Sequence, residues 1–385
     1  MLLVAGAPAP LADEDREMAF MKCVVACTFC CILTVTVLPD SDDSLRSEGL
    51  AGHRVLAIYG RQDNGRSPMC NVIFEDRNGV YWAGTSSGLK LYDESSDRWD
   101  DEIRVPWDVN SIGQSADGKL WFARRFLRNN DIPNLVSFDG REWRNIESLP
   151  KVKNAIRPGA VTVMFPASGG RLWFARGNEL LAYDGRGWGE PLKVSEAIRS
   201  EFPVSVRAGL QDSEGNIWLA TSEGIVRFNE LKRQWWTLDP FGRKGNVPVE
   251  LKRSMYAEMQ IVDGVTEIYE DRKGRVWFAS AISGSYFRYD KYTESWSHYT
   301  LADFLPANRP KDVDPGFTKM YQDRFGRMMF GTKMGLITFT EDDKEWQILS
   351  TQNSKLPDNL ITTIFEDRSG RIWVGTGAGI VVLER

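Results

Sequence analysis

The chain has 385 residues, of which 42% are hydrophobic and 26% are charged. This composition is typical of a soluble globular protein with a sizeable core, and the length fits either two average domains or one large all-β domain. The formal net charge of −5 gives no electrostatic footprint for nucleic acid, so a nucleic-acid-binding protein is not expected. The unusual feature of the composition is the 14 tryptophans.

An apolar segment near the N-terminus is predicted to direct export. Residues 23–38 (CVVACTFCCILTVTVL) carry no charge and directly follow Lys22, which is typical of the h-region of a signal peptide or of a short membrane anchor. The protein is therefore expected to be periplasmic or extracellular, with membrane contact only through this segment. Four of the five cysteines lie in this run. Only Cys70 remains downstream, so neither an intramolecular disulfide nor a Cys-based metal site is expected there.

Charge also sets the predicted boundaries of the N-terminal part. The acidic stretch DEDRE at 13–17 is atypical of a signal n-region, so the working start is predicted at Met18 or Met21. Residues 1–39 are therefore interpreted as a non-native start plus an export signal or anchor. Residues 40–52 are interpreted as a polar linker.

One motif repeats along the rest of the chain, with a mean spacing of about 48 residues that lies within the range of propeller blades. A glycine is followed three residues later by a large apolar side chain, then by an apolar residue, then by Gly or Ala. The glycines are Gly79, Gly118, Gly170, Gly215, Gly274, Gly326 and Gly370, and the residues three positions on are Trp82, Trp121, Trp173, Trp218, Trp277, Met329 and Trp373.

Each repeat predicts four short antiparallel strands, named A to D in chain order. An apolar run precedes the glycine, the motif Trp lies in strand B, a Gly-rich turn leads to strand C, and a tight polar turn leads to strand D, which brings another Trp. A lone four-stranded sheet cannot bury both faces, so the sheets are expected to stack around an axis. The sequence therefore predicts an all-β fold, a seven-bladed β-propeller over residues 53–385.

The two ends of the repeat array are complementary. The seventh repeat has strands A to C and reaches the end of the chain after residues 381–383, with no fourth-strand Trp. Residues 53–59 (HRVLAIY) form a predicted strand that precedes the first repeat. Pairing these two strands would remove free sheet edges, which are aggregation hazards. We therefore expect the N-terminal strand to close the ring.

The repeat pattern I-x-E-D-x-x-G-x-I-W-V-G-T-x-x-G-[LI], followed by Y-D and W, resembles the two-component regulator propeller repeat. The resemblance covers residues 53–385 and implies the periplasmic sensing half of a hybrid histidine kinase, often concerned with polysaccharide-derived ligands. No kinase, phosphoacceptor or regulator segment follows the seventh repeat, so a stand-alone propeller is expected. Repeats two and three depart from the pattern, with Ser115 and Ala167 in place of the Asp of the E-D pair.

The paired acids of the repeat are predicted to be structural. Glu75-Asp76, Glu270-Asp271 and Glu366-Asp367 recur in three different repeats, whereas an active site needs one constellation of general acid and base. An Asp three residues before a Gly instead predicts the A–B turn, in which the Asp caps backbone N–H groups and the Gly supplies a positive φ. The turn resembles the Asp-box turns of sialidases. Calcium is not expected, because Arg77, Arg272 or Arg368 follows each acid pair.

Catalytic motifs have little support in this sequence. Thirteen of the 14 tryptophans fall at strand B or D positions, where they predict packing between blades. The two histidines, His53 and His298, have no Ser or Cys nucleophile motif to serve. The seven-bladed streptogramin lyases are similar in their G-x-x-W-F units, but they use a catalytic His with a metal. No Gly-rich phosphate loop is present, so neither a cofactor nor a metal is expected.

Function is therefore expected in the connections that do not repeat, since propeller ligands bind at concave sites around the axis. Trp107 is the one tryptophan out of register, and we interpret it as either a packed loop residue or a stacking platform at the tunnel mouth. A basic rim able to hold an anionic sugar or carboxylate is predicted from the loop residues Arg124, Arg125, Arg128, Lys252 and Arg253, unless these are solvated loop charges.

The sequence thus predicts an exported sensor or protein-interaction propeller that is not an enzyme. Its partner would be a saccharide, another small molecule or a signalling protein. The alternative is a propeller lyase or hydrolase acting on glycans, with carboxylates from Asp108, Glu258 and Asp314 converging at the tunnel mouth.

Overall fold

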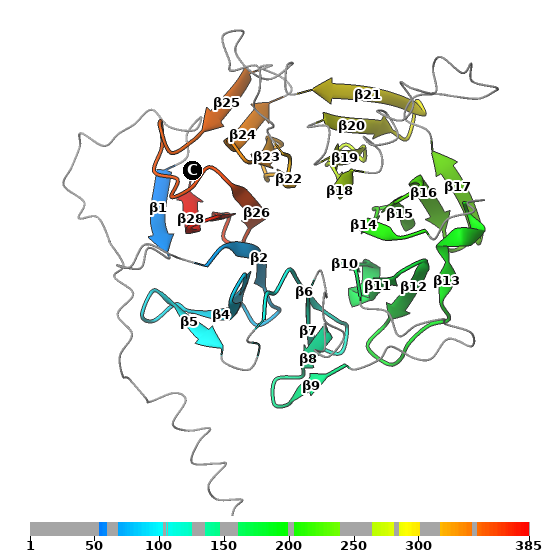
Figure 1. The fold of residues 1–385 in the computed structure, drawn as a ribbon, viewed down its shortest axis with the longest axis horizontal. Coiled ribbons are helices and arrows are strands. Elements are labelled where there is room, and N and C mark those ends of the chain that lie inside the picture. The colour runs from blue at the N-terminus through cyan, green and yellow to red at the C-terminus, as the bar shows by residue number, and fades with distance from the viewer. Residues whose placement is uncertain are drawn as a thin grey trace, which may run out of the picture. The chain divides into compact units, whose positions relative to one another are not determined.

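The computed structural model describes residues 54–59, 68–102, 105, 107–124, 135–146, 161–198, 204–238, 264–280, 285–300, 316–340 and 345–384. These residues form seven four-stranded antiparallel sheets arranged in a ring (Figure 1). The predicted all-β, seven-bladed propeller is therefore confirmed. The predicted export segment (1–39) and the linker (40–52) lie outside the described residues.

Each blade follows the predicted order of strands. Blade 1 contains β2 (Cys70–Glu75), β3 (Tyr81–Thr85), β4 (Gly88–Asp93) and β5 (Arg98–Glu102), and blade 2 contains β6 (Ser111–Gln114), β7 (Leu120–Ala123), β8 (Leu135–Phe138) and β9 (Trp143–Asn145). Blade 3 contains β10 (Val163–Pro166), β11 (Leu172–Arg176), β12 (Glu179–Tyr183) and β13 (Leu192–Lys193), and blade 4 contains β14 (Val206–Gln211), β15 (Asn216–Thr221), β16 (Gly224–Asn229) and β17 (Gln234–Leu238).

The remaining blades are built in the same way. Blade 5 contains β18 (Val265–Glu270), β19 (Val276–Ser280), β20 (Ser285–Asp290) and β21 (Ser295–Thr300). Blade 6 contains β22 (Lys319–Gln322), β23 (Met328–Thr332), β24 (Gly335–Thr340) and β25 (Glu345–Leu349). Blade 7 takes β26 (Ile361–Glu366), β27 (Ile372–Thr376) and β28 (Gly379–Glu384) from the end of the chain and β1 (Arg54–Tyr59) from before the first blade.

Blade 7 joins strands from the two ends of the described chain. β1 pairs antiparallel with β28, with Arg54 opposite Glu384 and Tyr59 opposite Ile380. β1 thus occupies the place that strand D has in the other six sheets. The edge of β28 is consequently hydrogen-bonded rather than open.

The strands A lie closest to the axis of the ring and the strands D lie at its rim (Figure 1). Because the strands alternate in direction, the A–B and C–D turns gather at one end of the ring, which we call the turn face. The B–C and D–A connections gather at the other end, which we call the loop face. Besides the strands, the described residues include two short 3₁₀ turns, Ser168–Gly170 and Val194–Glu196. No helix among the described residues is long and apolar enough to cross a membrane.

The core lies between the blades rather than at one centre. Seven clusters of buried side chains each join two neighbouring sheets, as Trp218 of blade 4 packs with Val276 and Phe278 of blade 5. The motif side chain of strand B contributes to a cluster in every blade, and Trp173, Trp218 and Trp373 are among its largest fully buried members. This confirms that the strand B tryptophans are packing residues. Cys70 is buried in one cluster as a free thiol, and burial raises the pKa of this thiol to about 12.

Candidate functional site

The acids of the repeat motif are engaged in holding the A–B turns. In blade 1, the side chain of Asp76 accepts hydrogen bonds from the backbone N–H groups of Asn78 (2.8 Å) and Val80 (3.1 Å), and the N–H of Gly79 donates to the Asp76 carbonyl at 3.0 Å. The seven motif glycines have φ between 72° and 94°, a region that side chains with a Cβ rarely adopt. The predicted capping role of Asp and the predicted positive φ of Gly are both confirmed.

The turn Asp also binds the motif Trp, which the sequence reasoning missed. The indole Nε1 of strand B donates to the Asp six residues earlier: Trp82 to Asp76 (3.2 Å), Trp218 to Asp212 (2.8 Å), Trp277 to Asp271 (2.8 Å) and Trp373 to Asp367 (2.8 Å). In blade 2 the Ser115 hydroxyl accepts the same bond from Trp121 at 2.9 Å. In blade 3, Ala167 supplies no acceptor, and the buried Nε1 of Trp173 has no hydrogen-bond partner among the described residues. The constant spacing of six residues could have revealed this contact.

The Glu of the E-D pair joins neighbouring blades. At six of the seven joints, the last residue of strand A accepts a hydrogen bond, at 2.6–3.1 Å, from the backbone N–H that follows the turn residue of the preceding blade, which is Asp except for Ala167 in blade 3. The acceptors are Gln114, Gln211, Glu270, Gln322, Glu366 and Glu75, and we call these contacts the blade joints. The recurring Glu or Gln directly before the turn residue is the signal that could have predicted them.

The joint between blades 2 and 3 is built differently, because Pro166 occupies the acceptor position and has no side-chain acceptor. A cluster of side chains bridges these blades instead. Tyr183 of blade 3 donates its hydroxyl hydrogen to Asp117 of blade 2 at 2.9 Å, and Lys119 donates to Tyr183 at 3.1 Å. Lys119 also pairs with Asp117 at 2.7 Å. This cluster keeps a polar contact between blades 2 and 3, although Pro166 departs from the repeat motif at this joint.

The predicted loop-face residues are only partly described. Trp107 is half-buried and packs against the cluster that joins blades 1 and 2, as in the packed-loop interpretation. Arg124 and Asp108 form an ion pair, with Arg124 Nε 2.6 Å from Asp108 Oδ1 and about a quarter to a third of each side chain exposed. These residues come together on the connections between blades 1 and 2 and within blade 2. Arg125, Arg128, Lys252, Arg253, Glu258 and Asp314 lie outside the described residues, so the basic rim and the convergent acids remain predictions.

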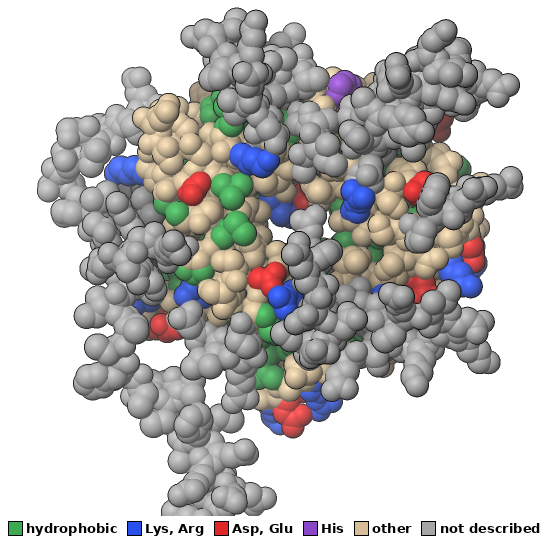
Figure 2. Space-filling model, viewed as in Figure 1, with side chains coloured by type: hydrophobic (Ala, Val, Ile, Leu, Met, Phe, Trp, Pro, Cys, Tyr) green, Lys and Arg blue, Asp and Glu red, His purple; other side chains and the backbone are tan. Residues whose placement is uncertain are grey.

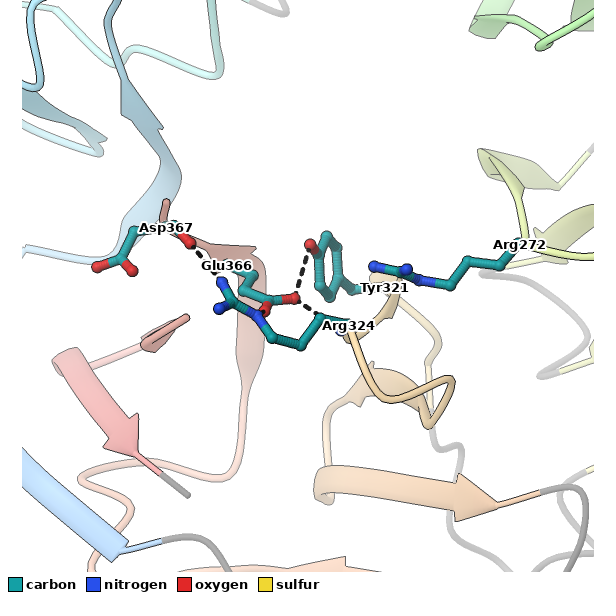
Figure 3. A pocket seen from close by; sticks show the side chains of 5 residues that line it. All are labelled: Arg272, Tyr321, Arg324, Glu366 and Asp367. Carbon is teal, nitrogen blue, oxygen red and sulfur yellow. Dashed lines mark hydrogen bonds and ion pairs between the residues drawn. The ribbon is translucent and has the colours of Figure 1, made fainter. Parts of the chain in front are cut away.

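A polar cavity lies on the turn face, away from the predicted rim. It has a volume of about 420 Å³ and is lined by Arg272, Tyr321, Arg324, Glu366 and Asp367. These residues come from the ends of strands A and the A–B turns of blades 5, 6 and 7 (Figure 3). Glu366 accepts hydrogen bonds from the Arg324 guanidinium, from the Arg324 backbone N–H at 3.0 Å and from the Tyr321 hydroxyl at 3.2 Å. Glu366 and Asp367 were predicted only as structural residues of the A–B turn, and a cavity beside them was not expected from the sequence.

The acids on this face carry their charges within hydrogen-bond networks. Burial opposes ionisation of Asp367, but hydrogen bonds from Ser369, Trp373 and Arg371 outweigh it and lower its pKa to about 2. At the joint of blades 4 and 5, the Lys291 ammonium lies 2.8 Å from Glu270 and 3.3 Å from Asp212. Among the residues that the structure describes, no group of three or more His, Cys, Asp or Glu side chains is placed to hold a metal ion. Lys, Arg, Asp and Glu side chains are interspersed on the face shown in Figure 2.

The ring of seven four-stranded sheets, with its axial strands A, defines the class of protein as a seven-bladed β-propeller. Residues 355–378 match the model of the two component regulator propeller family. The repeat at residues 355–378 thus matches the two-component regulator propeller repeat, as its motif predicted. No curated protein sequence matches the chain.

Solved structures share this fold at low sequence identity. The extracellular domain of BT4673 from B. thetaiotaomicron, described as a one component or hybrid two component system, superposes with a TM-score of 0.60 at 17% identity and covers 86% of this chain. The present chain spans 39% of that domain. Virginiamycin B lyase from Staphylococcus aureus has a TM-score of 0.57 at 13% identity, with 87% of this chain and 99% of the lyase covered. At these identities the likeness establishes the fold.

Proposed function

We propose that this propeller is an exported recognition module that senses a ligand and is not an enzyme. The observation that carries the proposal is the two-component regulator propeller repeat, found on a fold shared with the extracellular domain of BT4673. The described repeat acids have structural roles, because each turn Asp caps a turn and each joint Glu links two blades. This supports a binding role over a catalytic one. Signal transmission then requires a partner protein.

A saccharide is the proposed ligand, bound at the loop face. The residues expected to contact it are Trp107, Arg124 and the loop arginines and lysines outside the described part of the chain. Arg124 is held by Asp108 at 2.6 Å, so its guanidinium is oriented before a ligand arrives. A guanidinium fixed in this way can hydrogen-bond a sugar hydroxyl or carboxylate at a lower entropic cost.

The test is a thermal-shift screen of the purified chain against neutral and acidic oligosaccharides. A ligand that binds only the folded state must raise the unfolding temperature, and the stabilisation grows with the logarithm of its concentration once that concentration exceeds the Kd. A concentration-dependent shift that is lost on Arg124→Gln supports the proposal. No shift with any glycan, together with recovery of a protein partner in a pull-down, would rule out the saccharide ligand.

Glycan cleavage is the competing outcome of the same screen. The fold likeness to virginiamycin B lyase shows that a propeller of this size can carry catalysis. Reaction mixtures from the screen would therefore be analysed for new reducing ends or unsaturated products. Turnover that is abolished by Asp108→Asn would replace the sensor proposal with the enzyme.

A further inference from the structure

The position after the turn Asp differs systematically around the ring. Its backbone N–H makes the blade joint, so its side chain is not constrained by that contact. Four consecutive blades, numbers 5, 6, 7 and 1, carry arginine there, whereas the other three carry Ala or Ser. The arginines are Arg272, Arg324, Arg368 and Arg77, and all four are exposed. One arc of the turn face is therefore basic.

Three of these four arginines already have partners. Arg324 pairs with Glu366, and Arg368 lies 3.3 Å from Glu75, because the next blade offers a glutamate at its joint. Arg77 donates to the carbonyl of Ala116 at 3.0 Å. Each of these three guanidiniums therefore contacts a residue of the neighbouring blade.

Arg272 is the exception: the joint of the following blade carries Gln322 instead of Glu, as Gln114 does beside Arg77, but no described carbonyl accepts from the Arg272 guanidinium as that of Ala116 does from Arg77. The Gln322 side chain is already used on both sides: its Oε1 accepts from the Arg272 backbone N–H at 2.7 Å, and its Nε2 donates to the Gly326 carbonyl at 2.8 Å. A neutral amide cannot neutralise a guanidinium. The Arg272 side chain makes no hydrogen bond or ion pair with any described residue, and it extends toward Tyr321 across the turn-face cavity (Figure 3).

The cavity consequently carries one uncompensated positive charge among its described residues. Arg324 is balanced by Glu366, and Asp367 is balanced by Arg371 at 2.7 Å. Burial raises the pKa of the Tyr321 phenol, so this wall of the cavity stays neutral at physiological pH. Of the described residues that line the cavity, only Arg272 is left to bind an anion.

We propose that the turn-face cavity binds the carboxylate of a small monoanionic molecule, with the Arg272 guanidinium as its anchor. The planar guanidinium presents two parallel N–H donors, which fit the two oxygens of a carboxylate. The ring of Tyr321 forms a flat wall beside the guanidinium. A dianion such as phosphate is disfavoured, because the single uncompensated charge of Arg272 offsets only one of its two negative charges. This site lies on the face opposite the proposed saccharide site and is independent of it.

The probe pair is benzoate and benzamide, which share a shape and differ in charge. Binding of each to the full chain would be measured by isothermal titration calorimetry at low ionic strength, where an exposed guanidinium is least screened. We expect benzoate to bind at least about tenfold more tightly than benzamide, the lower end of the gain for a hydrogen bond to a charged group. Equal affinities for the two probes, or no saturable binding of benzoate, would overturn the proposal.

Three variants assign the effect to Arg272. Arg272→Gln should remove the preference for benzoate, whereas Arg186→Gln should leave it unchanged, because Arg186 is an equally exposed arginine on the C–D turn of blade 3. Gln322→Glu should abolish benzoate binding while Arg272 stays in place, because it supplies the glutamate that Arg324 and Arg368 already have. If both Arg272→Gln and Gln322→Glu still bound benzoate more tightly than benzamide, the anion would bind elsewhere and the proposal would be overturned.

Discussion

At the scale of single residues, one carboxylate satisfies three donors of the A–B turn. In blade 4, Asp212 accepts from the backbone N–H groups of Glu214 (3.0 Å) and Asn216 (2.8 Å) and from the indole of Trp218 (2.8 Å). A turn and the packing residue that follows it are thereby fixed together. Where the acceptor is missing, as at Ala167, a buried donor is left unpaired, and this costs free energy.

Blades 2 and 3 allow a reciprocal test of this contact. Ala167→Ser should give the Trp173 indole an acceptor and raise the free energy of unfolding by about 1 kcal/mol, the usual net value of a hydrogen bond. Ser115→Ala should leave the Trp121 indole unpaired and lower the free energy of unfolding by about 1–3 kcal/mol, the usual cost of a buried unsatisfied group. Urea unfolding measures both. A loss of stability in Ala167→Ser would show that the turn of blade 3 cannot accommodate a hydroxyl.

The turn acids also predict how stability depends on pH. Because the pKa of folded Asp367 is about 2 and its ordinary value is 3.8, ionised Asp367 stabilises the folded state fully above its unfolded pKa. That contribution is lost as the pH falls from about 4 to about 2. Asp367→Asn should be less stable at neutral pH and should show a shallower loss across this window. Urea unfolding over the window checks this, and parallel curves for the variant and the parent would contradict it.

At the scale of elements, a blade is stable only beside its neighbours, because its hydrophobic faces are completed by the next sheet. Between blades 7 and 1, Trp373 is fully buried among four rings, at centroid distances of 6.1 Å to Tyr59, 5.1 Å to Tyr81, 5.5 Å to Tyr92 and 5.9 Å to Trp99. The strand D tryptophans vary more in burial, since Trp99 is buried and Trp236 is only half-buried at the rim. The strand B tryptophans therefore contribute more than the strand D tryptophans to the packing between blades.

Trp373→Ala should lower the free energy of unfolding by about 3–5 kcal/mol, because it leaves a large cavity in the cluster. Trp236→Ala is the matched control and should cost less, since the Trp236 ring stacks on Arg227 at the rim and loses less buried contact. Chemical unfolding gives both values. Ligand affinity of the folded fraction should hardly change in Trp373→Ala, and a large loss of affinity would return the repeat motif to the candidate sites.

At the scale of the whole molecule, β1 links the two ends of the array. It hydrogen-bonds along β28, and its Tyr59 reaches into blade 1, where the hydroxyl donates to Asp97 at 2.6 Å. The same short strand therefore contacts both of the blades that meet at the seam of the ring. Its removal would expose an unpaired strand edge.

Deletion of residues 54–59 should lower the unfolding temperature and produce dimers or larger aggregates through the exposed edge of β28. Size-exclusion chromatography with light scattering would detect these species. Deleting residues 42–47 of the linker removes the same length of chain and should change neither property. A monomeric deletion variant with unchanged stability would show that β1 is dispensable for the seam.

The candidate site was far less predictable than the fold. The predicted binding residues lie on the loop face. Of these the structure describes Trp107, which packs on the core, and Arg124, which pairs with Asp108. The turn-face cavity was missed because Arg272 looks like any other motif arginine. Arg272 differs from Arg324 and Arg368 because the neighbouring blade offers it Gln322 instead of a glutamate. Gln322 is 50 residues away in sequence and comes close to Arg272 only in the folded ring.

The number of blades, the order of their strands and the structural role of the motif Asp and Gly and of the buried Trp could all be predicted from the amino-acid sequence. This was possible because turn geometry and strand burial depend on local side-chain chemistry that recurs with a fixed spacing. Which charges compensate one another could be read only from the folded ring, because ion pairing depends on which turn follows which around the axis. Glu366 and Glu75 neutralise Arg324 and Arg368, whereas the Arg272 side chain has no ion pair among the described residues.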